Sequence, residues 1–237
     1  MVKISVLTPS NRKIEGLELV KNALLRQSFR DYEWIIGSPT RPDINTEFIW
    51  VEDPPKNEGD YWCLNKLYNK MLLHCNGELV VSIQDFTSFN PTALGKFWFH
   101  YEKDPLAIVS GIGDKYASEE FVAKVWQDPR RRDDFGTYYE CNPADIEWNF
   151  ASCPKRALFE VGGFDEELDK YAGMDAYSVM DRLDMMGKYK FYLDQTNESY
   201  SLEHGRYKDW EDRNAIHGPY QKRRVFYMEN GPALSYI

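Results

Sequence analysis

The sequence predicts an α/β fold built on a mostly parallel central sheet that is flanked by helices. Short apolar runs alternate with stretches whose apolar residues recur every three or four positions, which is the pattern of strands joined by helical crossovers. The run at 79–83 is nearly continuous in its apolar character, as expected of a strand that is covered on both faces. Polar, glycine or proline residues follow several of these runs, and such strand ends line the ligand cleft of an open α/β sheet.

The alternating pattern places each element along the chain. Strands are expected at residues 3–7, 33–36, 48–51, 79–83, 106–109 and 189–193. Helices are expected at residues 17–27, 61–75, 92–101 and 175–186. Residues 113–147 show weak periodicity and are expected to form an irregular excursion with a short helix near 119–127. Long loops of this kind usually act as lids or binding loops.

Length and composition indicate one domain with an appendage. The 237 residues are 43% hydrophobic, which is enough for a full core. We expect the main domain at residues 1–200 and a C-terminal extension at 201–237 that packs on the active-site side. No apolar run approaches the length of a membrane span, and the N-terminus does not resemble a signal peptide, so a cytoplasmic protein is expected.

Charge and cysteine content exclude some classes of protein. A net charge of −9 argues against a dedicated nucleic-acid binder. The basic runs at 130–132 and 222–224 are expected to form a solvated face or ion pairs with nearby acids rather than a polyanion site. The four cysteines form no Cys-x-x-Cys pair, so free thiols are expected instead of a zinc site.

Four polar segments follow the predicted strands and are expected to meet at one edge of the sheet. They are residues 8–12, 37–39, 84–87 and 111–114. Because ligands of open α/β sheets bind beyond the carboxyl ends of the strands, this coincidence predicts a nucleotide-type cleft. The aromatic content of 15% also suits a site that stacks on a base or a sugar.

One segment resembles a known family. Residues 161–166, Val-Gly-Gly-Phe-Asp-Glu, combine a glycine turn, an aromatic residue and two acids, and Asp175 follows nine residues after Glu166. This pattern resembles the signature of the nucleotide-sugar glycosyltransferases with the GT-A fold, family 2 in particular. Other segments resemble that family in the same order, at residues 4–9, 27–28, 33–36, 64–69 and 77–78. The resemblance spans residues 3 to about 193 and implies a GT-A, Rossmann-like sheet.

The resemblance implies transfer of a sugar from a nucleoside-diphosphate sugar to an acceptor hydroxyl, with inversion and with Mn²⁺ or Mg²⁺. The donor-binding residues expected here are Thr8, Pro9, Arg12, Ser38, Trp62, Asn65, Gln84 and Asp85. Ser38 stands where the family often has an acid, and Trp62 is equally plausible as a core residue. The family's Asp-X-Asp metal motif is replaced by Gln84, Asp85 and Phe86, so Asp85 is the one remaining acid. His204 is the expected further metal ligand, with His217 in competition. Alternatively, Asp85 only caps the following turn and His204 is a plain structural residue.

On the acceptor side, Asp175 corresponds to the family's general base, which removes the proton of the attacking hydroxyl. An acid at the start of a helix also stabilises the free N–H groups there, so a structural role stays open. The acid that usually precedes the base is Met174 here, and a later one is Tyr177. The resemblance places Gly163, Asp165 and Glu166 on the acceptor side, although a plain turn acid is an equally open reading of Asp165. Trp148, after the excursion, is also expected on this side.

Two alternatives remain open from the sequence. The reduced metal motif and Met174 are also compatible with a GT-A-like domain that has lost catalysis and only binds a sugar or a protein. The basic runs at 130–132 and 222–224 allow an enzyme whose acceptor is a hydroxylated base in DNA, although the overall acidity argues against it. Otherwise the acceptor is an unknown hydroxyl of a glycan or a small molecule.

Overall fold

The computed structural model describes residues 2–11, 14–171, 175–203 and 213–237, with the backbone alone for 175 and 213–216. The helices are α1 (Ile14–Leu25), α2 (Leu64–Leu72), α3 (Ala93–Lys103), α4 (Lys155–Glu160), α5 (Asp175–Met185) and α6 (Arg213–Asn230). The strands are β1 (Ile4–Pro9), β2 (Tyr32–Ser38), β3 (Ile49–Glu52), β4 (Leu79–Ile83), β5 (Thr87–Phe89), β6 (Ala107–Tyr116), β7 (Lys124–Trp126), β8 (Tyr138–Glu140), β9 (Phe150–Pro154) and β10 (Lys190–Leu202). Two short 3₁₀ helices are η1 (Pro143–Asp145) and η2 (Glu166–Lys170).

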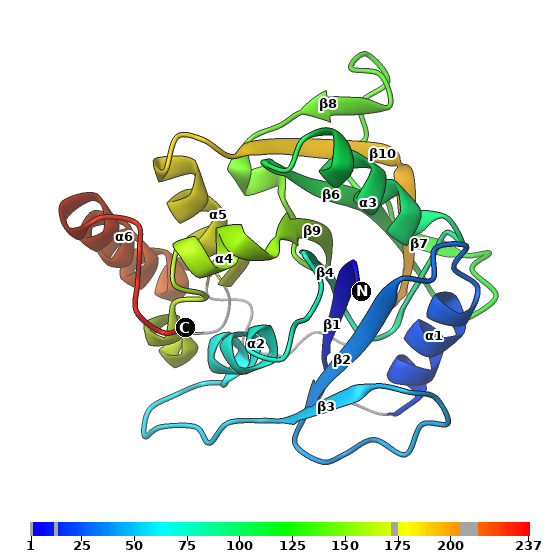
Figure 1. Cartoon of the computed structure of the whole chain (residues 1–237), viewed down its shortest axis with the longest axis horizontal. Coiled ribbons are helices and arrows are strands. Elements are labelled where there is room, and N and C mark those ends of the chain that lie inside the picture. Colours follow the sequence, from blue (N-terminus) through cyan, green and yellow to red (C-terminus); the bar gives the residue numbers. More distant parts are fainter. Residues whose placement is uncertain (1, 12–13, 172–174, 204–212) are drawn as a thin grey trace.

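The described strands form one ten-stranded sheet whose main order is β3-β2-β1-β4-β9-β6-β10-β5 (Figure 1). Strands β1, β2, β3 and β4 are parallel to one another, and β10 is parallel to β6. Strand β9 runs antiparallel between β4 and β6, so these two neighbours point the same way. The expected α/β fold with a mostly parallel sheet is therefore confirmed.

The register of these pairs brings the carboxyl ends of the strands together. Pro9 at the end of β1 pairs with Gly37, and Ser38 at the end of β2 pairs with Glu52 at the end of β3. Because β4 has the same direction, the residues that follow it emerge at the same edge. The expected meeting of the strand ends is therefore confirmed for β1, β2 and β4. It was wrong for residues 111–114, which lie inside β6 (Ala107–Tyr116), because β6 continues to pair with β10 beyond the apolar run.

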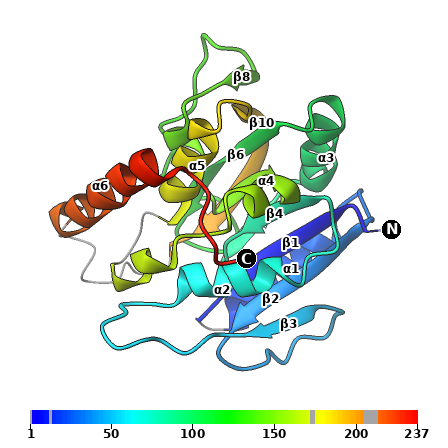
Figure 2. The same ribbon diagram turned by 60° about the vertical axis from the view of Figure 1, so that its left-hand side comes forward.

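Helices cover both faces of the sheet (Figures 1 and 2). One apolar core lies beneath α1 and α3 and includes residues such as Leu17, Leu94 and Phe97. The other lies beneath α2, α4 and α5 and includes residues such as Met71 and Leu183. Burial of strand side chains on both faces explains the nearly continuous apolar sequence of β4.

Two expectations about local structure were wrong. Residues 124–126 form strand β7 rather than a helix, because they pair antiparallel with the end of β6. Trp62 precedes α2 instead of lying on it, because its N–H donates to the Asp169 carbonyl oxygen at 3.2 Å. None of the described helices is long and apolar enough to cross a bilayer.

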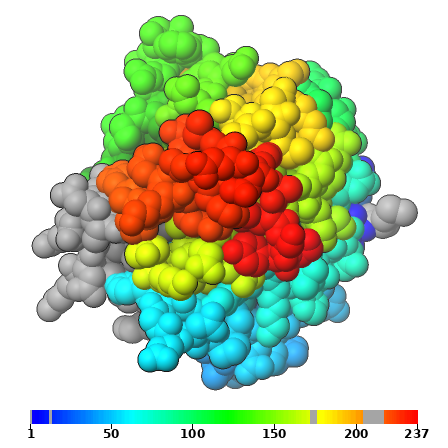
Figure 3. Space-filling view, turned by 90° about the vertical axis from the view of Figure 1, so that its left-hand side faces the viewer, coloured from blue at the N-terminus to red at the C-terminus, as the bar shows by residue number. Residues whose placement is uncertain are grey.

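The C-terminal segment folds back over the glycine turn. Helix α6 contacts α5, and the final residues run along η2 toward α2, as the space-filling view shows (Figure 3). The Leu234 N–H donates to the Val161 carbonyl oxygen at 3.0 Å. The division of the chain into a main domain and an extension at residue 200 stays a prediction. Strand β10 continues past this point, to Leu202, within the main sheet.

The turn after α4 requires glycine at two successive positions. Gly162 and Gly163 have φ angles of +69° and +79°, which only glycine adopts without strain. A Cβ on Gly162 would lie 1.8 Å from the Leu234 carbonyl oxygen, and one on Gly163 would lie 2.3 Å from Asn69 Oδ1. The close approach of the C-terminal segment and of α2 therefore depends on this turn.

Substitution of Gly163 with alanine should destabilise the protein by on the order of 3 kcal/mol, because backbone strain and a steric clash with Asn69 combine. The measurement is the free energy of unfolding from urea denaturation. Gly187→Ala is the matched control, since Gly187 has a similar φ of +65° but a Cβ added there would meet no atom within 4 Å. If the free energy of unfolding fell equally in the two variants, the clash with Asn69 would contribute nothing to the destabilisation.

Candidate functional site

The ends of β1 and β2 form the first part of the candidate site. Thr8 is fully buried, and its Oγ1 accepts a hydrogen bond of 3.0 Å from Trp34 Nε1. The Ser10 N–H donates to the Gly37 carbonyl oxygen at 2.8 Å, which ties the loop after β1 to the end of β2. Ser38 Oγ accepts from Trp50 Nε1 at 3.1 Å, so these strand ends are held in fixed positions beside Pro9.

Asp85 follows β4 at the same edge and is 1% exposed. Its Oδ2 accepts a hydrogen bond of 2.7 Å from Ser10 Oγ, which joins the ends of β1 and β4. Half-buried Gln84 donates its N–H to the Asn149 carbonyl oxygen at 3.0 Å. The structure thus brings Asp85 and the strand-end residues together, as the sequence predicted.

Phe86 directly follows Asp85 after β4. Its φ is +58°, a conformation that is uncommon for a bulky residue and that marks a constrained site. Its ring packs so closely on α1 that a Cβ on Gly16 would lie 2.5 Å from it. The aromatic side chain therefore serves packing and leaves Asp85 as the carboxylate of this segment.

The described residues do not make a complete metal site. Among them, no group of three or more His, Cys, Asp or Glu side chains could hold an ion. Asp85 contributes one carboxylate, whereas Mg²⁺ and Mn²⁺ require about six oxygen ligands. His204, the predicted further ligand, and Arg12 lie outside the described residues, as does Met174. His217 is exposed on α6.

Asp53 is a site residue that sequence reasoning missed. It follows β3, and its N–H donates to the Ser38 carbonyl oxygen at 3.1 Å, which places it beside the strand ends. Burial raises the pKa of its carboxyl to about 6, and its Oδ1 is enclosed without a hydrogen-bond partner in the described part of the chain. The signal that could have revealed it was the pair of acids, Glu52 and Asp53, after the strand predicted at 48–51.

Trp62 and Asn65 lie at the start of α2, where Asp169 organises the backbone. Asp169 Oδ1 accepts from both the backbone N–H and the Nδ2 of Asn65, each at 2.9 Å. Asn65 is fully buried, so its amide serves this helix start. Trp62 is half-buried, and its Nε1 has no hydrogen-bond partner among the described residues. Their contact with a donor nucleotide stays a prediction.

Asp165 is the centre of a buried network. Its carboxylate accepts from Arg223 Nε at 2.6 Å and from Tyr236 Oη at 3.1 Å, and it also accepts from Tyr227 Oη. It is fully buried, and it further accepts from the Glu167 N–H at 3.2 Å. These contacts attach the C-terminal segment to the turn, a role that the residue pattern alone did not reveal.

The other predicted acceptor-side residues surround the same turn. Glu166 Oε1 accepts from Asn69 Nδ2 at 2.9 Å, next to Gly163. Trp148 is 3% exposed and packs against Tyr68 and Phe164 in the core, with ring centroids 6.4 and 5.9 Å away. The turn and Glu166 are close together, whereas Trp148 lies beneath the surface as a packing residue.

Asp175, the predicted base, is the first residue of α5, whose backbone position agrees with the sequence expectation. Tyr177, two residues later, is 45% exposed. Arg182 on the same helix is fully buried and donates to the carbonyl oxygens of Val161 and Gly163, both at 2.6 Å. The helix that carries Asp175 is therefore bound directly to the glycine turn.

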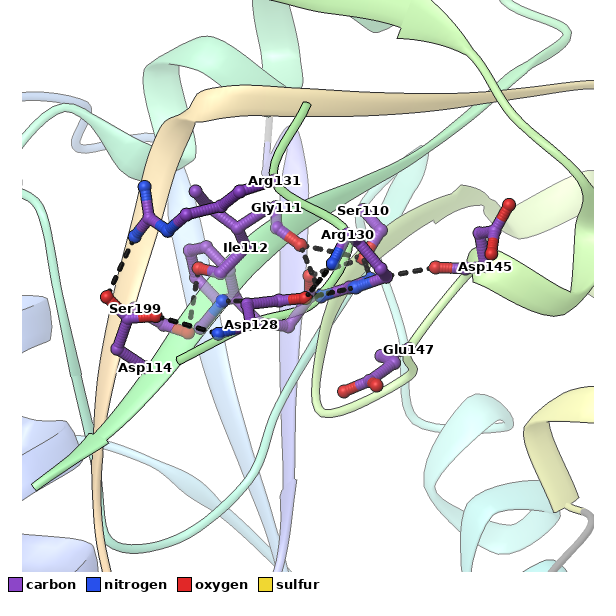
Figure 4. A network of polar contacts seen from close by, with 12 residues as sticks. Ser110, Gly111, Ile112, Asp114, Asp128, Arg130, Arg131, Asp145, Glu147 and Ser199 are labelled. Carbon is purple, nitrogen blue, oxygen red and sulfur yellow. Dashed lines mark hydrogen bonds and ion pairs between the residues drawn. The ribbon is translucent and has the colours of Figure 1, made fainter. Parts of the chain in front are cut away.

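The excursion between β6 and β9 is anchored by Arg130 (Figure 4). The guanidinium donates to Ser110 Oγ at 2.9 Å and to the carbonyl oxygens of Gly111 and Asp145 at 3.1 and 2.7 Å. It also forms an ion pair with Asp128, whose side chain is fully buried. Burial opposes the charge of Asp128, but the bonds from Arg130 outweigh it and lower the pKa of this carboxyl.

Arg131 and the basic residues of α6 form ion pairs as well. Arg131 Nη2 lies 2.9 Å from Asp114 Oδ2 and 3.1 Å from Glu198 Oε1. Arg224 Nε lies 3.1 Å from Asp181 Oδ2. The expectation that the basic runs form ion pairs is confirmed for these residues, although Arg131 pairs with distant acids rather than with its neighbours in sequence.

No family model matches this sequence, and no curated protein matches it. The fold is that of the GT-A glycosyltransferases, as the comparison with solved structures shows. One similar structure is S. aureus TarS, residues 1–349, solved in complex with UDP. The TM-score is 0.59 at 14% sequence identity, and the match covers 85% of this chain and 60% of the TarS chain. At this identity the likeness establishes the fold.

Replacement of Arg130 by alanine should destabilise the protein by on the order of 3 kcal/mol, because Asp128 would be left buried without its counterion. Urea denaturation provides the measurement. Arg132→Ala is the control, since Arg132 is exposed and its substitution should change the free energy of unfolding by less than about 0.5 kcal/mol. If Arg130→Ala changed the free energy of unfolding as little as Arg132→Ala, the ion pair between Arg130 and Asp128 would not anchor the excursion.

Proposed function

We propose that this protein is a nucleotide-sugar glycosyltransferase that transfers a sugar to an acceptor hydroxyl with inversion. The observation that supports it most is the position of Asp85 in a GT-A fold, where it is bonded to Ser10 at the shared carboxyl edge of β1, β2 and β4. In open α/β sheets this edge binds nucleotides. TarS, a solved structure of the same fold, was crystallised in complex with UDP. A cytoplasmic location stays a prediction.

In the proposed reaction the acceptor oxygen attacks the anomeric carbon of the donor sugar. The bond between this carbon and the diphosphate oxygen breaks, and the nucleotide leaves with the electron pair. Asp175 takes the proton of the attacking hydroxyl. Thr8, Ser38 and Asp53 lie at the strand ends where the donor's nucleoside part would bind, with Arg12, Trp62 and Asn65 as further predicted donor contacts.

A divalent cation is part of the proposal. Asp85 and His204, together with the donor's phosphate oxygens, would hold Mn²⁺ or Mg²⁺, since one carboxylate does not make a site by itself. When bound, the ion would neutralise charge on the departing diphosphate.

The observations no longer favour DNA as the acceptor. That alternative depended on the arginines of the two basic runs. Four of the five arginines, Arg130, Arg131, Arg223 and Arg224, form ion pairs with acids of this chain, which leaves exposed Arg132 as the one arginine of the two runs without an ion pair among the described residues. A glycan or small-molecule hydroxyl is the acceptor that we propose.

The donor side can be tested by calorimetric titration of UDP with and without Mn²⁺. We expect Mn²⁺ to tighten UDP binding between about 5-fold and 150-fold, because ion and diphosphate bind together, and we expect Asp85→Asn to abolish this coupling. Asp133→Asn, which removes the same charge from an exposed residue, should leave it unchanged. Coupling that survives in the Asp85 variant would exclude this residue as a ligand.

The catalytic side can be tested by UDP release from UDP-sugars. Asp175→Asn should lower turnover by roughly 10²-fold to 10⁴-fold while UDP affinity is retained, since a general base contributes about this much. Asp184→Asn, an exposed acid on the same helix, is the control. UDP binding without any turnover in the wild-type protein, unchanged by Asp175→Asn, would instead support a binding domain that has lost catalysis.

A further inference from the structure

A pocket of about 510 Å³ lies where α1 ends, α3 begins and β6 leads toward β7. Its lining includes Arg26, Asn90, Tyr116, Glu119, Phe121 and Tyr200. Among the residues that the structure describes, none of the predicted donor or acceptor-side residues, nor Asp85, lines it. Its volume falls within the range of about 300–1,000 Å³ that is usual for small-molecule sites.

Three aromatic rings form one wall of this pocket. The ring centroids of Tyr116, Phe121 and Tyr200 are separated by 5.5, 5.9 and 6.1 Å, so each ring contacts the other two. Phe121 is only partly buried and has a φ of +52°. Such a conformation costs of order 1–3 kcal/mol for a residue other than glycine, and strain of this kind concentrates at functional sites.

Polar groups with fixed orientations face these rings across the pocket. Arg26 Nη2 donates to Ser88 Oγ at 3.0 Å, which uses one of the five N–H donors of the guanidinium. Tyr200 Oη lies 2.8 Å from Asn90 Oδ1, and this bond leaves the Asn90 amide nitrogen as a potential donor. Glu119 supplies an exposed acceptor at the rim.

The geometry argues against two kinds of ligand. The aromatic rings contact one another, so no space remains between them for a quaternary ammonium group, which binds within an aromatic cage. The single arginine of the lining is accompanied by the carboxylate of Glu119, which disfavours a phosphate group. A neutral ligand with one apolar face and several hydroxyls fits the remaining features.

We propose that this pocket is an accessory saccharide-binding site. The C–H face of a pyranose ring would pack on the aromatic wall, whose π faces carry partial negative charge. Its hydroxyls would bond to Arg26, Asn90 and Glu119, which offer both donors and acceptors. The residues that would bind the saccharide differ from the described donor residues, so the proposal does not depend on the proposed transfer activity.

The test is saturation-transfer NMR on the full chain with maltose, lactose and N,N′-diacetylchitobiose, with choline and inorganic phosphate as comparison probes. We expect at least one disaccharide to bind, with an affinity that saturating UDP does not change. Phe121→Ala should weaken this binding about tenfold, which corresponds to about 1.4 kcal/mol of lost ring contact. Asn90→Ala should weaken it as well, through the loss of a hydrogen bond to a sugar hydroxyl.

Phe135→Ala is the matched control, because Phe135 is 56% exposed in the same excursion but does not line the pocket. Tyr200→Phe keeps the ring and the fold, and it should preserve most of the binding. The proposal is overturned if no disaccharide binds, if UDP displaces the sugar, or if Phe121→Ala and Phe135→Ala behave alike. Binding of choline or phosphate in place of the disaccharides would also overturn it.

Discussion

The buried carboxylate of Asp165 is the interaction on which the acceptor half of the molecule depends. A charge in a fully buried position is stable only when it is paired and fully hydrogen-bonded. Arg223, Tyr227 and Tyr236 provide these bonds from the C-terminal segment. Because the carboxylate belongs to the glycine turn, the last 25 described residues are bound to the turn that precedes α5. The position of α5, which carries the proposed base, is therefore set in part by the C-terminal segment.

A second buried ion pair organises the excursion after β6. Arg130 and Asp128 are held inside the excursion after β6, and the arginine bonds to backbone and side-chain oxygens of β6 and η1. Loops with so many internal bonds are less free to open than their length implies. The excursion is therefore held firmly against the sheet, in spite of its irregular sequence. The pocket at Phe121 lies in an earlier part of the same excursion, where β6 leads toward β7.

The sequence predicted the sheet well because its strands are short, apolar and separated by clear turn residues. Leu79–Ile83 could be read as a buried strand, and the residues after it could be read as a ligand-facing end. The residues near 124–126 could not be read in the same way, since pairing with β6 outweighs their weak helical pattern. Strand pairing over long distances leaves little trace in local periodicity, so β7 emerged only in the folded molecule.

What the sequence determined by itself was the fold class, the glycine turn and the identity of the acid after β4, because each depends on local residue type and spacing. Only the tertiary structure decided how the polar residues are used. Asn65 bonds to Asp169, Asp165 bonds to the C-terminal segment, and Asp53 emerges beside Ser38 at the strand edge. The reason is physical. The sequence identifies a carboxylate or an amide, but its role is set by its burial and by hydrogen-bond partners that are distant in the chain.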